Sequence, residues 1–98
     1  MEITINGVSY KFSFRGFGPQ YTYELIMGEP YDASSKRSFH MLQYATLIAC
    51  NAESFKMTFA DFSEWLYDHP AEERAMADAI AEESVRRMNL AGNDKKKE

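Results

Sequence analysis

The strongest pattern in the chain is an Asn6-Gly7 pair set between two short runs of alternating apolar and polar residues. Asn-Gly favours a two-residue type I′ turn, because both central positions of that turn need a positive φ. Such a turn fixes the strand register and places apolar residues on one face as three cross-strand pairs: Ile5–Val8, Ile3–Tyr10 and Met1–Phe12. A hairpin alone is marginally stable in water. The sequence therefore predicts an N-terminal antiparallel hairpin that packs on other elements.

The rest of the chain has the spacing and end signals of helices. Pro19 suits the first turn of one helix, and Gly28 suits its end. Pro70 suits the start of the last helix, and Gly92 suits its end. Two more helices are expected between these, the first capped by Ser34 or Ser35 and the second by Thr58. The predicted helices cover residues 19–27, 36–51, 59–69 and 70–91.

The second of these helices is apolar around most of its surface. Only a narrow strip of three residues is predicted to be exposed to solvent: Lys36, His40 and Gln43. A helix that is apolar nearly all round is usually buried, so we expect it to be the central element. The predicted fold class is α+β, an N-terminal two-stranded antiparallel β-hairpin packed on a bundle of about four α-helices.

The chain has 98 residues, of which 45% are hydrophobic, and this is the size and composition of one small domain. We expect a single globular domain over residues 1–91. The charged residues 92–98 are predicted to form a disordered tail. The start of the chain has no signal-peptide pattern and no apolar run is long enough for a membrane span, which predicts a cytoplasmic protein.

The residues that often carry chemistry are few and scattered. The two histidines, His40 and His69, have no zinc-ligand spacing, and the single cysteine, Cys50, lies in an apolar run typical of a buried, inert thiol. The acidic residues of the last helix have the pattern of a solvated face. A net charge of −4 argues against general nucleic-acid binding. We therefore expect no enzymatic activity, no cofactor and no metal site.

The aromatic content of 14% exceeds what one small core readily buries. Tyrosine and tryptophan are enriched at protein interfaces, so we expect some of these rings to border a surface that binds another protein. The predicted partner-binding residues are Tyr21, Tyr23, Tyr31, Trp65 and Tyr67. The alternative is that the tyrosines line the edge of the core with only their hydroxyl groups in water. Tyr21 and Leu25 also share one side of the first predicted helix.

The opening residues Ile3-Thr4-Ile5-Asn6-Gly7, followed by Tyr10-Lys11-Phe12 and a tyrosine-bearing helix, resemble the start of tail assembly chaperones of long-tailed bacteriophages and prophages. The central segment 44–48 and the segment 58–62 match the family in layout. The resemblance implies a non-catalytic protein of the bacterial host cytoplasm. Such a protein binds the tape measure protein and keeps it soluble during tail assembly, and it is absent from the finished virion.

Some members of this family are also made in a frameshift-extended form, and Lys95-Lys96-Lys97 would suit an A-rich slippery message. The resemblance carries over no catalytic residue and no defined contact motif. The alternative function is a structural or adaptor subunit that forms a stable homo- or hetero-oligomer, either as a phage connector component or as a cytosolic interaction protein. A structural subunit would stay in the finished particle, whereas a chaperone would leave it.

Overall fold

The computed structural model describes residues 1–31 and 35–97. Strands β1 (Glu2–Ile5) and β2 (Val8–Lys11) form an antiparallel hairpin in which Ile3 pairs with Tyr10 and Ile5 with Val8. The turn residues both have positive φ, 53° at Asn6 and 84° at Gly7. The predicted turn and register are confirmed.

The hairpin buries a smaller apolar face than the alternation predicts. Ile3, Ile5 and Phe12 are buried, whereas Met1 and Val8 are about half exposed. A two-stranded ribbon twists strongly, so its corners turn away from the helices that it covers. Backbone hydrogen bonds still join Met1 and Phe12 beyond the strand ends, the shorter at 2.9 Å.

The described residues also form four helices: α1 (Gly18–Met27), α2 (Lys36–Cys50), α3 (Phe59–Asp68) and α4 (Pro70–Lys97). The Ser35 hydroxyl accepts from the Ser38 N–H and caps α2, and the Thr58 hydroxyl accepts from the Asp61 N–H and caps α3. Ser34, the alternative cap, lies outside the described residues. The predicted α+β class, a hairpin followed by about four helices, is confirmed.

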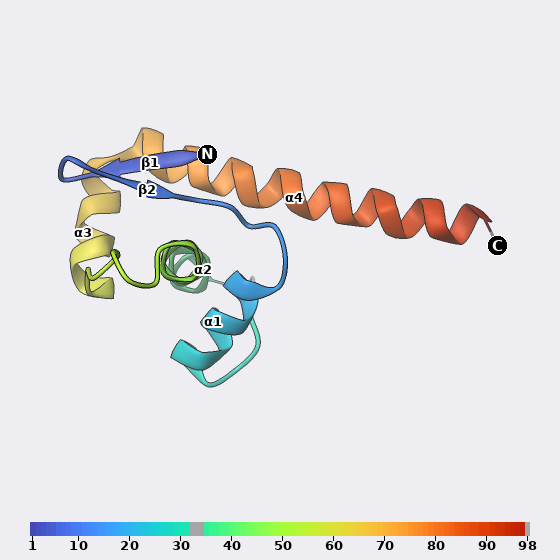
Figure 1. Cartoon of the computed structure of the whole chain (residues 1–98), viewed down its shortest axis with the longest axis horizontal. Helices are drawn as coiled ribbons and strands as arrows, with labels where there is room; N and C mark the ends of the chain where they lie inside the picture. Colours follow the sequence, from blue (N-terminus) through green and yellow to red (C-terminus); the bar gives the residue numbers. More distant parts are fainter. Residues whose placement is uncertain (32–34, 98) are drawn as a thin grey trace.

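Helix α2 is the centre of the molecule, as predicted. Figure 1 shows it end-on, between α1 and α3 and beneath the hairpin and α4. Leu42, Ala45 and Leu47 on α2 are almost fully buried, as are Phe62 on α3 and Met76 on α4. One core therefore joins all these elements.

The burial of Gln43 contradicts the prediction that this residue belongs to a solvent-exposed strip along α2. Its side chain is fully buried, and neither Oε1 nor Nε2 has a hydrogen-bond partner among the described residues. His40, one turn earlier, forms an ion pair with Glu73 of α4, with 3.4 Å between Nε2 and Oε2. Residues 40 and 43 share one side of α2, and Glu73 brings α4 to His40, whereas Lys36 is exposed as predicted.

Asn51 fastens the hairpin to the end of α2. Its Oδ1 accepts from the Lys11 N–H at 3.0 Å, and its Nδ2 donates to the carbonyl oxygens of Lys11 at 2.7 Å and Leu47 at 2.9 Å. The amide therefore pairs with the free edge of β2 as a neighbouring strand would. It fixes β2 relative to α2, 40 residues away along the chain.

Helix α4 does not end at Gly92 as predicted but continues to Lys97. One glycine costs a helix only about 1 kcal/mol, and alanine and lysine are good helix formers, so Ala91 and the lysines carry the helix onward. Figure 1 shows α4 extending well beyond the body, which gives the molecule extents of 49 × 27 × 26 Å. The division into a globular domain, 1–91, and a disordered tail, 92–98, stays a prediction.

Candidate interaction surface

The structure separates the five predicted partner-binding residues. Tyr23 is buried in the core, and Trp65 is nearly buried between the rings of Phe62 and His69. Neither ring is accessible in this structure, because each fills space that the packing of its helix encloses. Whether any of the five residues contacts a partner stays a prediction.

The other three tyrosines do not lie together either. Tyr31 is half-buried, with its ring edge-on to Tyr23 at 5.4 Å between centroids. Tyr67 is 88% exposed on α3, and Tyr21 is 58% exposed on α1. Only Tyr21 belongs to a larger apolar surface of the described residues.

That surface is a stripe on α1, which we call the α1 stripe: Phe17, Tyr21 and Leu25. Phe17 precedes the helix, and the other two follow it at intervals of four residues, so all three share one side. Leu25 is 86% exposed, and Phe17 and Tyr21 are each about half exposed. The rings of Phe17 and Tyr21 stack at 5.8 Å, which holds the first half of the stripe rigid.

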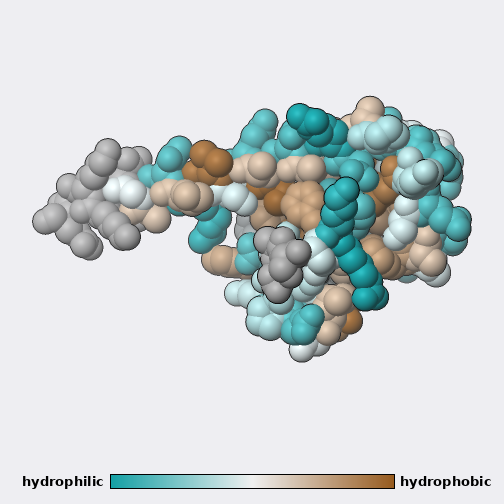
Figure 2. Space-filling view, turned by 180° about the vertical axis from the view of Figure 1, so that it is seen from behind, coloured by the Kyte–Doolittle hydropathy of each residue, from teal (hydrophilic) through white to brown (hydrophobic). Residues whose placement is uncertain are grey.

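The α1 stripe contacts α4 through the side chain of Arg87. The Arg87 guanidinium lies over the Phe17 ring, with 4.7 Å between Cζ and the ring centroid, in the geometry of a cation–π contact. Around this contact α4 bears three exposed apolar side chains: Val85, Met88 and Leu90. Figure 2 shows apolar surface on the part of α4 that extends past the body.

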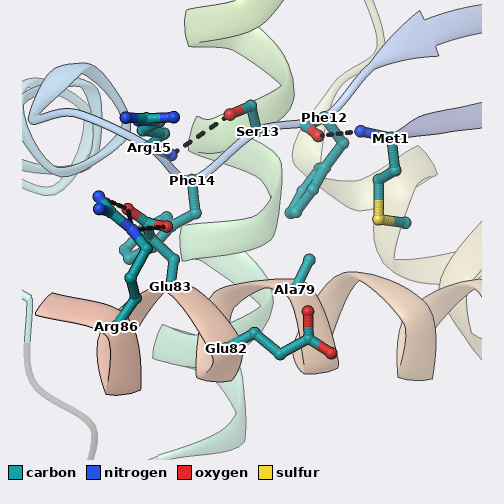
Figure 3. A pocket seen from close by; sticks show the side chains of 9 residues that line it. All are labelled: Met1, Phe12, Ser13, Phe14, Arg15, Ala79, Glu82, Glu83 and Arg86. Atoms are coloured by element: carbon teal, nitrogen blue, oxygen red, sulfur yellow. Dashed lines mark hydrogen bonds and ion pairs between the residues drawn. The ribbon is translucent and has the colours of Figure 1, made fainter. Parts of the chain in front are cut away.

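A shallow pocket of about 400 Å³ lies between the chain after β2 and the middle of α4. Figure 3 shows Phe12, Phe14 and Arg15 on one side of it, and Glu83 and Arg86 on the other.

Two of the charged residues that line the pocket, Glu83 and Arg86, are paired within α4. Arg86 Nε donates to both carboxylate oxygens of Glu83 at 3.0 Å, and its Nη2 donates to Oε1 at 2.6 Å. These bonds hold the pKa of the Glu83 carboxyl below its ordinary value and raise the pKa of Arg86. A carboxylate bound in this way is a poor general base, and the pair forms part of the pocket wall.

The remaining reactive side chains are each engaged at separate places. Cys50 is partly exposed, contrary to the prediction of a core thiol, and its Sγ donates to the Ser13 carbonyl oxygen at 3.4 Å. The His69 ring lies 2.7 Å from the Trp65 carbonyl oxygen through Nδ1. Across the part of the chain that the structure describes, no three His, Cys, Asp or Glu side chains gather to hold a metal ion. Over the same residues, no helix is long and apolar enough to span a membrane.

Sequence reasoning missed Phe17 and Leu25 as surface residues. The available signal was the i, i+4 spacing of Phe17, Tyr21 and Leu25, and aromatic content alone does not indicate Leu25. Burial of Tyr23 could not be read from the sequence, because it depends on how α1 is rotated against α2.

No family model matches the chain, and comparisons with curated proteins and with solved structures likewise return no match.

Proposed function

We propose that the chain is a non-catalytic assembly chaperone of phage or prophage tails, which binds the tape measure protein in the bacterial cytoplasm and keeps it soluble. The observation that carries the proposal is the α1 stripe, an exposed row of apolar side chains at helical spacing. The hairpin sequence that resembles the family supplies the identity of the partner.

The stripe suits a helical partner. Phe17, Tyr21 and Leu25 span a little over two turns of helix, and an apolar row of this length packs against the apolar side of another helix. Tape measure proteins are long and helical in the family that the chain resembles. Such a partner exposes apolar rows of its own until the tail tube encloses it.

The overall charge of the chain supports a holding role. A net charge of −4 keeps an acidic protein apart from its own copies during diffusion. Two exposed acidic residues are near the stripe in sequence: Glu24 on α1, and Glu29 just after it. They keep the rim polar around an apolar centre, which is the usual anatomy of an interface that opens again.

The test is co-expression with the tape measure protein encoded in the same genome, using the double variant Tyr21→Lys, Leu25→Lys. Both positions are exposed and lysine is a good helix former, so the fold should be retained, as circular dichroism would verify. Loss of two apolar anchors costs an interface about 2 kcal/mol or more. We expect binding to weaken roughly 30-fold and the tape measure protein to become insoluble.

The matched control is Val8→Lys, which changes an apolar residue of similar exposure on β2, outside the α1 stripe. This variant should keep the partner soluble. Equal binding by the wild type and the double variant would refute the role of the stripe. No effect of the wild-type chain on solubility of the tape measure protein would refute the chaperone itself.

The alternative is a structural or adaptor subunit. The exposed apolar residues of α4, on a helix that projects from the body, favour it. Mass spectrometry of purified tails separates the two functions, since a chaperone is absent from the finished particle and a structural subunit remains in fixed proportion.

A further inference from the structure

The α1 stripe begins beside three arginines, which we call the basic end: Arg15, Arg86 and Arg87. Arg15 is two residues before Phe17, and the Arg87 Cζ atom lies 4.7 Å from the centroid of the Phe17 ring. Hydrogen bonds from Arg86 lower the pKa of the Glu83 carboxyl, and the charges of Arg15 and Arg87 lower it further. All three guanidinium groups therefore lie near one carboxylate, and three positive charges against one negative charge give this end a net charge of +2.

Two of these arginines have no carboxylate partner among the described residues. Arg86 is paired with Glu83, but no described Asp or Glu side chain lies within ion-pair distance of Arg15 or Arg87. Both arginines are exposed, and Figure 3 shows the Arg15 side chain separate from the Glu83–Arg86 pair. These two charges are therefore available to an acidic group on a partner that covers the stripe.

The far end of the stripe has the opposite charge, and we call Glu24 and Glu29 the acidic end. Glu24 is next to Leu25 on α1, and Glu29 follows the left-handed turn at Gly28, whose φ is 72°. Both glutamates are exposed, and they line a shallow hollow of about 230 Å³ together with Gly28 and Pro30. No Lys, Arg or His of the described part of the chain forms an ion pair with either carboxylate.

We propose that the α1 stripe binds one amphipathic helix of the partner in a fixed direction, with an acidic residue of that helix at the basic end and a basic residue at the acidic end. This inference rests on the proposed function and gives the chemistry of the tape measure segment that the chain binds. Contact along the apolar row supplies affinity, and the charges at its two ends select the direction, because the reverse direction would bring like charges together. The dipole of α1 adds to the same field, since its N-terminal end is positive.

Isothermal titration calorimetry with synthetic peptides tests the charge pattern. The first peptide is an alanine-rich helix of about 20 residues, with three leucines at intervals of four, glutamates before the leucines and lysines after them. The second peptide has lysines at both ends. We expect the full chain to bind the first peptide roughly tenfold more tightly at low salt, and this preference should decrease as salt screens the charges. Equal binding of the two peptides, or no binding of either, would overturn the proposal.

The double variant Arg15→Glu, Arg87→Glu reverses the sign of the basic end, so it should bind the second peptide more tightly than the first. Tight binding of the second peptide also verifies that the stripe is intact, although residue 87 no longer contacts Phe17 as a cation. The matched control is Lys56→Glu, which changes an exposed charge in the segment between α2 and α3, away from α1. This control should keep the preference of the wild type. An unchanged preference in the double variant would contradict the role of the basic end.

Nuclear magnetic resonance tests the direction of the bound helix. A nitroxide label at the glutamate end of the first peptide should broaden the amide signals of Gly16 and Gly18 more than that of Gly28. The two ends can be distinguished because residues 17 and 25 are about 12 Å apart along α1. A label at the lysine end should give the reverse pattern. Equal broadening at both ends with either label would mean that the helix binds in both directions, and the proposal would be wrong.

The inference and the proposed function can fail separately. Segments of the tape measure protein that the wild type binds should have the charge pattern of the first peptide, and they should bind Arg15→Glu, Arg87→Glu roughly tenfold more weakly. If the wild type binds no segment of the tape measure protein, the proposed function fails, whereas the peptides still decide the polarity of the stripe. If the double variant binds those segments as tightly as the wild type does, the polarity is refuted and the chaperone role stands.

Discussion

Gln43 places an unpaired amide in the centre of the molecule. The residue is fully buried on α2, and the described residues offer no hydrogen-bond partner to either end of its side chain. A buried polar group without a partner costs about 1–3 kcal/mol of stability. This cost makes position 43 a place where stability can be gained.

We predict that Gln43→Met stabilises the protein by roughly 1–2 kcal/mol, because methionine has a similar shape and no polar group to desolvate. For a chain of this size, that change raises Tm by several degrees, about 4–8 °C per kcal/mol. Thermal unfolding followed by circular dichroism measures it.

Thr46→Val is the matched control for Gln43→Met. Thr46 is equally buried on α2, but its hydroxyl donates to the Leu42 carbonyl oxygen at 2.7 Å. Removing a satisfied group should give no gain in stability. A lower Tm for Gln43→Met than for the wild type would mean that the amide has a partner in solution, and the prediction would be wrong.

The residues that sequence reasoning placed correctly are those with local causes. The φ angles at Asn6 and Gly7 and the caps at Ser35 and Thr58 depend on neighbours within three residues. Gln43 was placed wrongly, since its burial depends on which elements cover it. The same limit applies to the site: the spacing of Phe17, Tyr21 and Leu25 was readable, but their exposure was not.

At the scale of elements, one side chain links the hairpin to α2 through hydrogen bonds. Asn51 makes three hydrogen bonds, two of them to the backbone of Lys11. The sequence predicted Asn51 only as the end of a helix, because nothing local indicates a contact with a residue 40 positions earlier. The arrangement of the elements is thus set by contacts that the element boundaries do not reveal.

We predict that Asn51→Ala lowers the free energy of unfolding by about 2 kcal/mol, because three hydrogen bonds are lost and the carbonyl oxygens of Lys11 and Leu47 lose their side-chain donor. Urea unfolding gives this value. Hydrogen exchange gives a local readout, because the Lys11 amide loses its acceptor and should exchange faster than the amides of β1.

The variant Asn51→Asp keeps the hydrogen-bond acceptor of the side chain and removes its donor, so it tests the two separately. The aspartate keeps an oxygen for the Lys11 N–H but faces the carbonyl oxygens of Lys11 and Leu47 with a negative charge, so it should cost at least as much as alanine at neutral pH. Protonation at acid pH restores a donor and should reduce the difference. Unchanged exchange at Lys11 in both variants would contradict the role of Asn51.

At the scale of the whole molecule, α4 has two separate roles along its length. Met76 and Ile80 belong to the core, and the cation–π contact of Arg87 with Phe17 lies beyond them. Past that contact the helix projects away from the body (Figure 1). Folding should therefore depend on the first part of α4 and little on its end.

We predict that a chain ending at Ala91 folds as the full chain does, with a free energy of unfolding of the monomer within about 0.5 kcal/mol of the original value. The deletion removes none of the core residues among those that the structure describes. Urea unfolding of the two chains measures the difference. A large loss of stability in the shortened monomer would show instead that residues 92–98 belong to the folded domain.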